Sequence, residues 1–185
     1  ACPVDHKQRM CAKDGFSSGR YRMASGGIVD IDWRKEERHP FTRGEITRLS
    51  SWCEIGTTAT RRVAGGWVVG CSGVESDGAL GFLSDGAEQL QAFARMGVDF
   101  IVPLGARTLV AASSPFEAGE AGAVFTVDRA TDASWKLDLF SLLPSVPDAY
   151  APGGSGIAFR AGFNAVFMAD DGAISTLDCV DDGVR

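Results

Sequence analysis

The chain has 185 residues, 45% of them apolar, and a net charge of −6, as is usual for one ordinary globular domain. Its basic residues are scattered or interleaved with acids. We therefore do not expect nucleic acid as a partner, since that would require a basic stripe. No run approaches the ~20 apolar residues of a membrane-spanning helix. The chain begins at Ala1, which fits the removal of a leader peptide or a trimmed start.

Residues 7–50 form the first predicted unit. The β-prone run Tyr21–Ala24 is followed, after a short turn, by Gly26–Asp32, in which two glycines precede Ile, Val and Ile. Two such runs around a glycine-containing turn predict a β-hairpin. The stretch Thr42–Ile55 is typical of a short helix that begins at Thr42 as its N-cap.

Residues 51–97 form the second unit. The apolar run Trp67–Gly70 precedes Gly78–Ser84, which begins with glycine and alanine and continues with large apolar residues. This pair predicts a second hairpin. Asp85–Met96 carries apolar residues at helical spacing, so we expect a helix there in place of an outer strand.

Residues 98–150 form the third unit. Three short β-prone runs follow one another in it, at Asp99–Val102, Leu109–Ala112 and Gly122–Asp128. Further along, Trp135–Phe140 alternates apolar and polar residues, a pattern that predicts an exposed outer strand. The unit therefore offers four consecutive strands.

Residues 151–185 form the fourth unit. Its predicted strands are Gly156–Phe159, Val166–Ala169 and Gly172–Asp178. The last two are separated by Asp-Asp-Gly, a common turn sequence. They predict a fourth hairpin of the same form as the first three.

A glycine leads the second strand of each predicted hairpin, at Gly26, Gly78, Gly122 and Gly172, so the motif recurs every 44–52 residues. A repeat of ~40–50 residues with three or four antiparallel strands has the size of one propeller blade. We therefore predict a single all-β domain over residues 1–185, a small β-propeller of about four blades with one or two short helices. Because of those helices, a plain α+β domain is the alternative.

Five cysteines lie near the two ends and in the middle of the chain, namely Cys2, Cys11, Cys53, Cys71 and Cys179. A closed ring must fasten its first blade to its last. A disulfide from Cys2 or Cys11 to Cys179 would do this and stabilise the fold by about 2–5 kcal/mol. Cys53 and Cys71 could form a second pair or be buried thiols. Paired cysteines would indicate an oxidising compartment, and we expect a periplasmic or secreted protein.

The segment Pro152–Asp178 resembles a blade of the gluconolactonase and NHL class of propellers. Such blades run as Gly-Ile-Ala-Phe, a turn, an aromatic-rich strand ending in Ala-Asp, and then Gly-x-Ile-x-x-Leu-Asp. Residues 98–139 resemble a second blade loosely. The resemblance implies a propeller fold, and with it a divergent metal-dependent hydrolase as an alternative function. In that family an Asn before the Gly-Ile strand binds the metal, whereas Ser155 stands here, and the chain is short for six blades. We expect no metal.

Other residues with catalytic or metal-binding chemistry carry no complete signature. His6 lies between Cys2 and Cys11, but a structural zinc site needs a fourth ligand, which is missing. A nucleophilic pair of His39 with Cys53 or Cys71 has no flanking motif. We therefore predict no catalytic residue and no cofactor.

The loop Ser113–Glu120 interrupts the third hairpin, whose counterpart in the fourth unit is shorter. It carries two hydroxyls, one aromatic ring and two acids, and extended loops of this kind often bind partners. The candidate partner-binding residues are Ser113, Ser114, Phe116 and Glu117.

Together these features favour a non-enzymatic binding protein, with a surface recognition domain as a second alternative. By size, compartment and architecture the chain is similar to periplasmic immunity proteins, which neutralise cell-wall-degrading effectors of type VI secretion. That similarity implies a toxin inhibitor whose loop enters the active site of a secreted effector. The negative charge would favour a basic partner.

Overall fold

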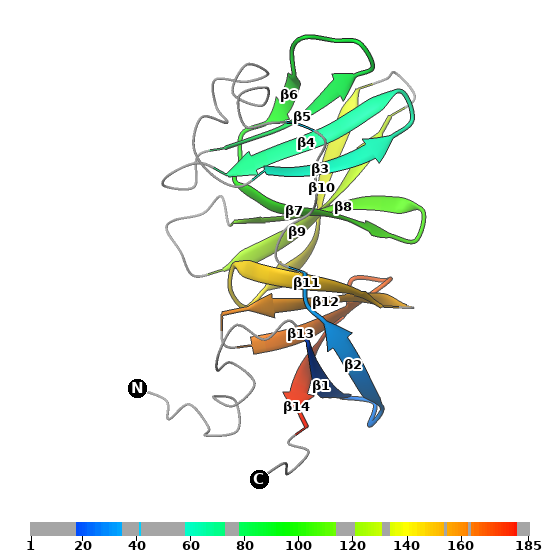
Figure 1. Cartoon of the computed structure of the whole chain (residues 1–185), viewed down its shortest axis with the longest axis vertical. Helices are drawn as coiled ribbons and strands as arrows, with labels where there is room; N and C mark the ends of the chain where they lie inside the picture. The colour runs from blue at the N-terminus through cyan, green and yellow to red at the C-terminus, as the bar shows by residue number, and fades with distance from the viewer. Residues whose placement is uncertain are drawn as a thin grey trace. The chain divides into compact units, whose positions relative to one another are not determined.

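The structure is a computed structural model, and it describes residues 18–34, 41, 58–72, 78–113, 121–130, 134–153, 155–162 and 164–180. Every regular element in these ranges is a β-strand, which confirms the predicted all-β class (Figure 1). The strands are β1 (Ser18–Met23), β2 (Ile28–Asp32), β3 (Thr58–Val63), β4 (Gly66–Ser72), β5 (Gly78–Ser84), β6 (Gln91–Ala94), β7 (Val98–Leu104), β8 (Arg107–Ser113), β9 (Gly122–Arg129), β10 (Trp135–Leu143), β11 (Pro147–Gly153), β12 (Gly156–Ala161), β13 (Asn164–Ala169) and β14 (Ile174–Cys179).

The strands form three sheets, and the chain divides into two compact units. The first unit comprises Ala1–Lys35 and Asp148–Arg185, and the second comprises Glu36–Pro147. A six-stranded sheet in the order β11-β12-β13-β14-β1-β2 belongs to the first unit. The β3–β6 sheet and the β7–β10 sheet belong to the second unit, and each is a four-stranded meander.

The six-stranded sheet joins the two ends of the described chain. The β1–β2 hairpin, blue in Figure 1, lies beside β14, red, and Tyr21 pairs with Cys179 in an antiparallel register. The sheet also curls, because Arg34 just beyond β2 exchanges two backbone hydrogen bonds of 2.8 and 3.0 Å with Tyr150 of β11. The two outer strands of the sheet are therefore linked to each other.

Alternation along β1 and β2 explains why they form this sheet. Tyr21 and Ile31 are buried, whereas their neighbours Arg22, Asp30 and Asp32 are exposed, the pattern of a strand with one face in the core. The buried residues of this core cluster are Tyr21, Ile31, Trp33, Ala149, Ala151, Ala158 and Leu177.

The two meanders of the second unit share a hydrophobic core. Strand β7 contacts β3, β4 and β5 of the other sheet. The core cluster draws its buried residues from both sheets: Ala59, Val68, Leu80, Met96, Val98, Ile101, Val110, Ala112 and Val127. Strands β7 and β8 are buried along most of their length, so they form the rigid centre of this unit.

The four motif glycines serve two different purposes. Gly26 and Gly172 adopt positive φ angles of 89° and 88° in matching four-residue turns, a conformation that favours glycine. Gly78 and Gly122 instead begin β5 and β9 where a neighbouring backbone is very close. A Cβ on Gly78 would lie 2.2 Å from the carbonyl oxygen of Cys71. The motif glycine therefore permits a turn at two of the four positions and a close backbone approach at the other two.

All four predicted hairpins are confirmed by strand pairing, β1 with β2, β4 with β5, β8 with β9 and β13 with β14. The predicted helix at Asp85–Met96 is wrong, because residues 91–94 form β6 at the edge of the β3–β6 sheet. In that position Phe93 packs against the shared core, and such tertiary packing overrides the local helical spacing. The predicted helix Thr42–Ile55 lies outside the described residues.

A four-bladed propeller is not confirmed. The strands of the second and third predicted units form separate four-stranded sheets, as a blade would. The strands of the first and fourth units combine instead, because the β1–β2 hairpin hydrogen-bonds to β14. The result in the described part of the chain is three sheets.

Candidate functional site

The β7–β10 sheet holds the two ends of the loop that is predicted to bind a partner. Its central strands β8 and β9 form the hairpin that the predicted loop connects. Ser113 is the last residue of β8 and pairs with Gly122, the first residue of β9. Ser114, Phe116 and Glu117 lie outside the described residues, so the structure places the two roots of the loop.

Both roots of this loop are firmly held. Ala111 and Ala112, which precede Ser113, are completely buried. On the other side, a Cβ on Gly122 would lie 2.4 Å from the carbonyl oxygen of Ser145, so the backbone there leaves no room for a side chain. A loop whose two ends lie on rigid strands is a common location for binding residues.

The connection between β8 and β9 is also long for a hairpin. Residues 114–121 separate these strands, whereas two residues separate β3 from β4 and β7 from β8. Two-residue connections are the commonest form of a hairpin, and the other hairpins among the described strands have connections of at most six residues. The length supports an added role for this segment.

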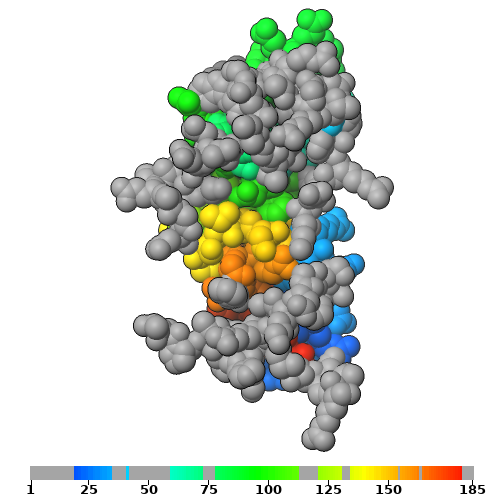
Figure 2. Space-filling model, turned by 60° about the vertical axis from the view of Figure 1, so that its left-hand side comes forward, coloured from blue at the N-terminus to red at the C-terminus, as the bar shows by residue number. Residues whose placement is uncertain are grey.

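Strand β10 forms one edge of the same sheet, and sequence reasoning missed its exposed leucines. Among the described strands, β10 pairs only with β9, and Leu139 and Leu142 are 58% and 65% exposed. A bulge between Leu139 and Ser141 shifts the register. Because of this shift both leucines face the same side of the sheet, instead of the opposite sides that their odd spacing would give in a regular strand. In the sequence, the break in the alternation of apolar and polar residues along β10 is the signal that could have revealed this exposed pair of leucines. Yellow atoms of the β10–β11 part of the chain reach the surface in Figure 2.

The first residue of β10, Trp135, belongs to an aromatic cluster between the two meanders. Its ring stacks on Phe93 with centroids 5.5 Å apart and an interplanar angle of 11°, and it lies 4.9 Å from Phe82. The guanidinium of Arg129 lies over both Phe82 and Trp135, at 5.3 and 5.9 Å, a cation–π arrangement. These contacts fix the start of β10 against β6.

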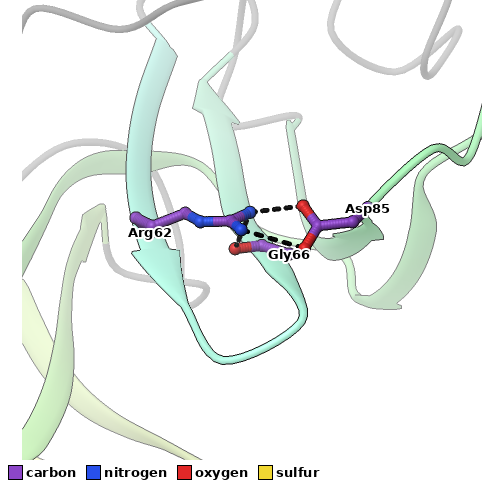
Figure 3. Close-up of polar contacts among 3 residues, drawn as sticks. All are labelled: Arg62, Gly66 and Asp85. Carbon is purple, nitrogen blue, oxygen red and sulfur yellow. Dashed lines mark hydrogen bonds and ion pairs between the residues drawn. The ribbon is translucent and has the colours of Figure 1, made fainter.

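Arg62 and Asp85 form an ion pair in the second unit (Figure 3). The guanidinium of Arg62 contacts both carboxylate oxygens of Asp85 and donates a hydrogen bond of 3.1 Å to the carbonyl oxygen of Gly66. The same guanidinium lies 5.4 Å from the ring of Trp67. It thus connects two adjacent turns, and its hydrogen bonds lower the pKa of Asp85. Both side chains are about half exposed, so we assign this pair a structural role.

The described residues include no group of three or more His, Cys, Asp or Glu side chains that could hold a metal ion. Asp171 accepts a hydrogen bond of 2.9 Å from the backbone N–H of Ala173, and the carbonyl oxygen of Ser155 accepts one from Asp170. These contacts belong to turn formation. His6 and His39 lie outside the described residues, as do Cys2, Cys11 and Cys53. In the same part of the chain no helix could cross a membrane.

Comparisons of this chain with protein-family models, with curated proteins and with solved structures find no match. The similarity of Pro152–Asp178 to gluconolactonase and NHL blades therefore remains a prediction.

Proposed function

We propose that this chain is a non-enzymatic protein-binding domain, and that the loop between β8 and β9 contacts the partner. The observation that carries the proposal is the anchoring of this loop. Its roots, Ser113 and Gly122, are paired in register at the end of two central strands, and its eight residues exceed what the hairpin needs. A rigid support keeps the entropy lost on binding low.

The chemistry of the loop suits a protein surface. Phe116 offers an apolar anchor, Ser113 and Ser114 offer hydrogen-bonding hydroxyls, and Glu117 and Glu120 add negative charge. Aromatic anchors surrounded by polar groups are typical of residues that dominate protein interfaces. The net charge of −6 favours encounter with a basic partner.

The narrower form of the proposal is an extracytoplasmic inhibitor. In this form the chain is a periplasmic or secreted immunity protein, and its loop enters the active site of a cell-wall-degrading effector of type VI secretion. The support is the predicted similarity of size and architecture, together with an extended loop on a rigid sheet. Inhibition would then follow from occlusion of the partner's substrate groove.

Affinity capture with matched variants tests the binding role. The wild-type chain, Ser114→Asp and Phe116→Ala would each be used as bait against an extract of the source organism, and any captured protein would then be purified and titrated. We expect both loop variants to lose at least tenfold in affinity, because an interface anchor contributes ~2 kcal/mol or more. Ser25→Asp, in the exposed turn between β1 and β2, is the control and should bind like the wild type.

Two results would count against the proposal. If the loop variants bind as tightly as the wild type, another surface makes the contact. If a captured enzyme stays fully active when saturated with the chain, the inhibitor form is wrong while the binding role stands. Loss of peptidoglycan hydrolysis at an equimolar ratio would support the inhibitor form.

A further inference from the structure

Strand β10 forms an edge of the β7–β10 sheet, and the proposed role of the loop between β8 and β9 does not involve it. Edge strands normally avoid pairing with other chains by means of bulges, prolines or charges. The charges of this segment, on Lys136 and Asp138, are of opposite sign, so a second copy can match them. In β10 the bulge begins only after Leu139, so the five residues Trp135–Leu139 form a regular edge. That segment ends in an exposed leucine.

The two faces of this segment differ in chemistry. Trp135, Leu137 and Leu139 face one side, since alternate residues of a strand share a face, and the first two pack against the shared core. Lys136 and Asp138 face the other side, where Lys136 Nζ lies 2.7 Å from Asp138 Oδ2. These two side chains are 66% and 50% exposed, so both can contact another molecule.

We propose that β10 pairs with β10 of a second copy of this chain, antiparallel about a two-fold axis at Leu137. In this register Leu137 lies opposite Leu137 of the other copy, and Trp135 lies opposite Leu139. On the other face, Lys136 of each copy lies opposite Asp138 of the other copy. Side chains directly opposite each other in an antiparallel pair are about 4.5–5.5 Å apart at Cβ, close enough for each of these pairs to interact favourably.

The charges select this register over its neighbours. An axis at Lys136 would place two lysines opposite each other, and an axis at Asp138 would place two aspartates opposite each other, both of which destabilise a sheet. An axis at Leu139 would set Asp138 against Phe140, inside the bulge. The segment is therefore self-complementary in one arrangement, as an isologous two-fold interface requires.

The expected dimer is of modest affinity. Pairing of one short strand from each copy buries less than a standard interface, a size that is typical of weak, transient contacts, so the dimer should dissociate on dilution. The two new ion pairs join the existing contact between Lys136 and Asp138 to give four alternating charges at the surface. Added salt should weaken the dimer, because exposed ion pairs are screened.

Charge reversal and mixing test this proposal on the full chain. Lys136→Asp leaves two acids in the segment, and Asp138→Lys leaves two bases. In a dimer of either variant, like charges would lie opposite each other. Each variant alone should therefore sediment as a monomer at concentrations where the wild type dimerises. An equimolar mixture of the two should form a heterodimer, since every opposing pair is then of opposite charge. Glu88→Lys, an exposed position in the turn after β5, is the control and should dimerise like the wild type.

Several outcomes would overturn the proposal: a wild-type chain that stays monomeric at every concentration, single variants that dimerise as well as the wild type, or a mixture that does not associate. Far-UV circular dichroism shows whether both variants are folded. If they are folded and their mixture does not associate, this register is excluded. Both substituted side chains are exposed, so we expect native spectra.

Discussion

Trp33 and Tyr21 meet edge to face in the core of the six-stranded sheet, with their ring centroids 5.6 Å apart and their planes at 87°. The indole Nε1 of Trp33 donates a hydrogen bond of 3.0 Å to the hydroxyl oxygen of Tyr21. Both residues are buried. The indole N–H is the one polar group of the Trp33 side chain, and burial removes it from water. The hydroxyl oxygen of Tyr21 supplies the acceptor that this N–H needs.

Tyr21→Phe should destabilise the protein by about 1–3 kcal/mol, because the buried indole N–H loses this acceptor. Urea denaturation of the two proteins measures the difference. Trp33→Phe removes the donor instead, and the double variant should be less destabilised than the two single changes added together, since the contact is lost only once. Additive effects would show that the hydrogen bond contributes nothing.

The ion pair between Arg62 and Asp85 predicts a dependence of stability on pH. The hydrogen bonds from Arg62 lower the pKa of Asp85 in the folded protein relative to the unfolded chain, where it is about 3.9. The pair therefore stabilises the fold above the unfolded pKa, and this contribution is lost as the pH falls through the lower folded pKa. In Arg62→Gln, the NMR titration midpoint of the Asp85 carboxyl should rise.

Arg20→Gln is the control for this titration. Arg20 makes a similar exposed contact with Asp30, Nε to Oδ1 at 3.0 Å, but on a different sheet. Its loss should leave the titration of Asp85 unchanged. An Asp85 midpoint that is the same in the wild type and in Arg62→Gln would contradict the assigned cause of the shift.

Gly122→Ala should destabilise the protein by about 1–3 kcal/mol, because a Cβ would lie 2.4 Å from a backbone oxygen and the strand must move to accept it. Thermal or urea unfolding measures this change. Gly27→Ala is the matched control, since no atom lies within 4 Å of its added Cβ, and it should differ from the wild type by less than about 0.5 kcal/mol. Equal effects of the two changes would show that the close approach at Gly122 is not needed.

Local signals explain why the hairpins could be predicted. Each consists of two β-prone runs separated by a turn that glycine or a polar pair permits, and the whole pattern is contained in a short stretch of sequence. The outer strand at Trp135–Phe140 was predicted correctly by its alternation. Its two exposed leucines were missed, because the bulge that aligns them depends on the register with β9.

Non-local contacts explain the failures. The apolar spacing of Asp85–Met96 fits a helix, but Phe93 obtains its burial from Trp135, which lies in another sheet and far along the chain. The union of the first and last predicted units follows from the pairing of Tyr21 with Cys179, partners at opposite ends of the sequence. No local pattern encodes which strand edge another hairpin will choose.

The same pairing bears on the cysteines. Cys179 lies opposite Tyr21 on β1, and β1 begins at Ser18, only seven residues after Cys11 in the sequence. A segment of this length spans up to about 24 Å when extended. Because β1 and β14 are antiparallel, the first residue of β1 lies near the last residue of β14, which is Cys179. Cys11 therefore precedes the sheet at the end where Cys179 lies. In the second unit, Cys71 is buried on β4.

We therefore predict that Cys179 forms a disulfide with Cys2 or Cys11, and that Cys53 pairs with Cys71. Alkylation without reduction, followed by peptide mapping in a mass spectrometer, should label a single cysteine near the N-terminus. Reduction should lower the free energy of unfolding by about 2–5 kcal/mol, as is usual when a long closed loop is opened. Labelling of all five cysteines in the unreduced protein, isolated from its source without reductant, would contradict both pairs, and with them the prediction of an oxidising compartment.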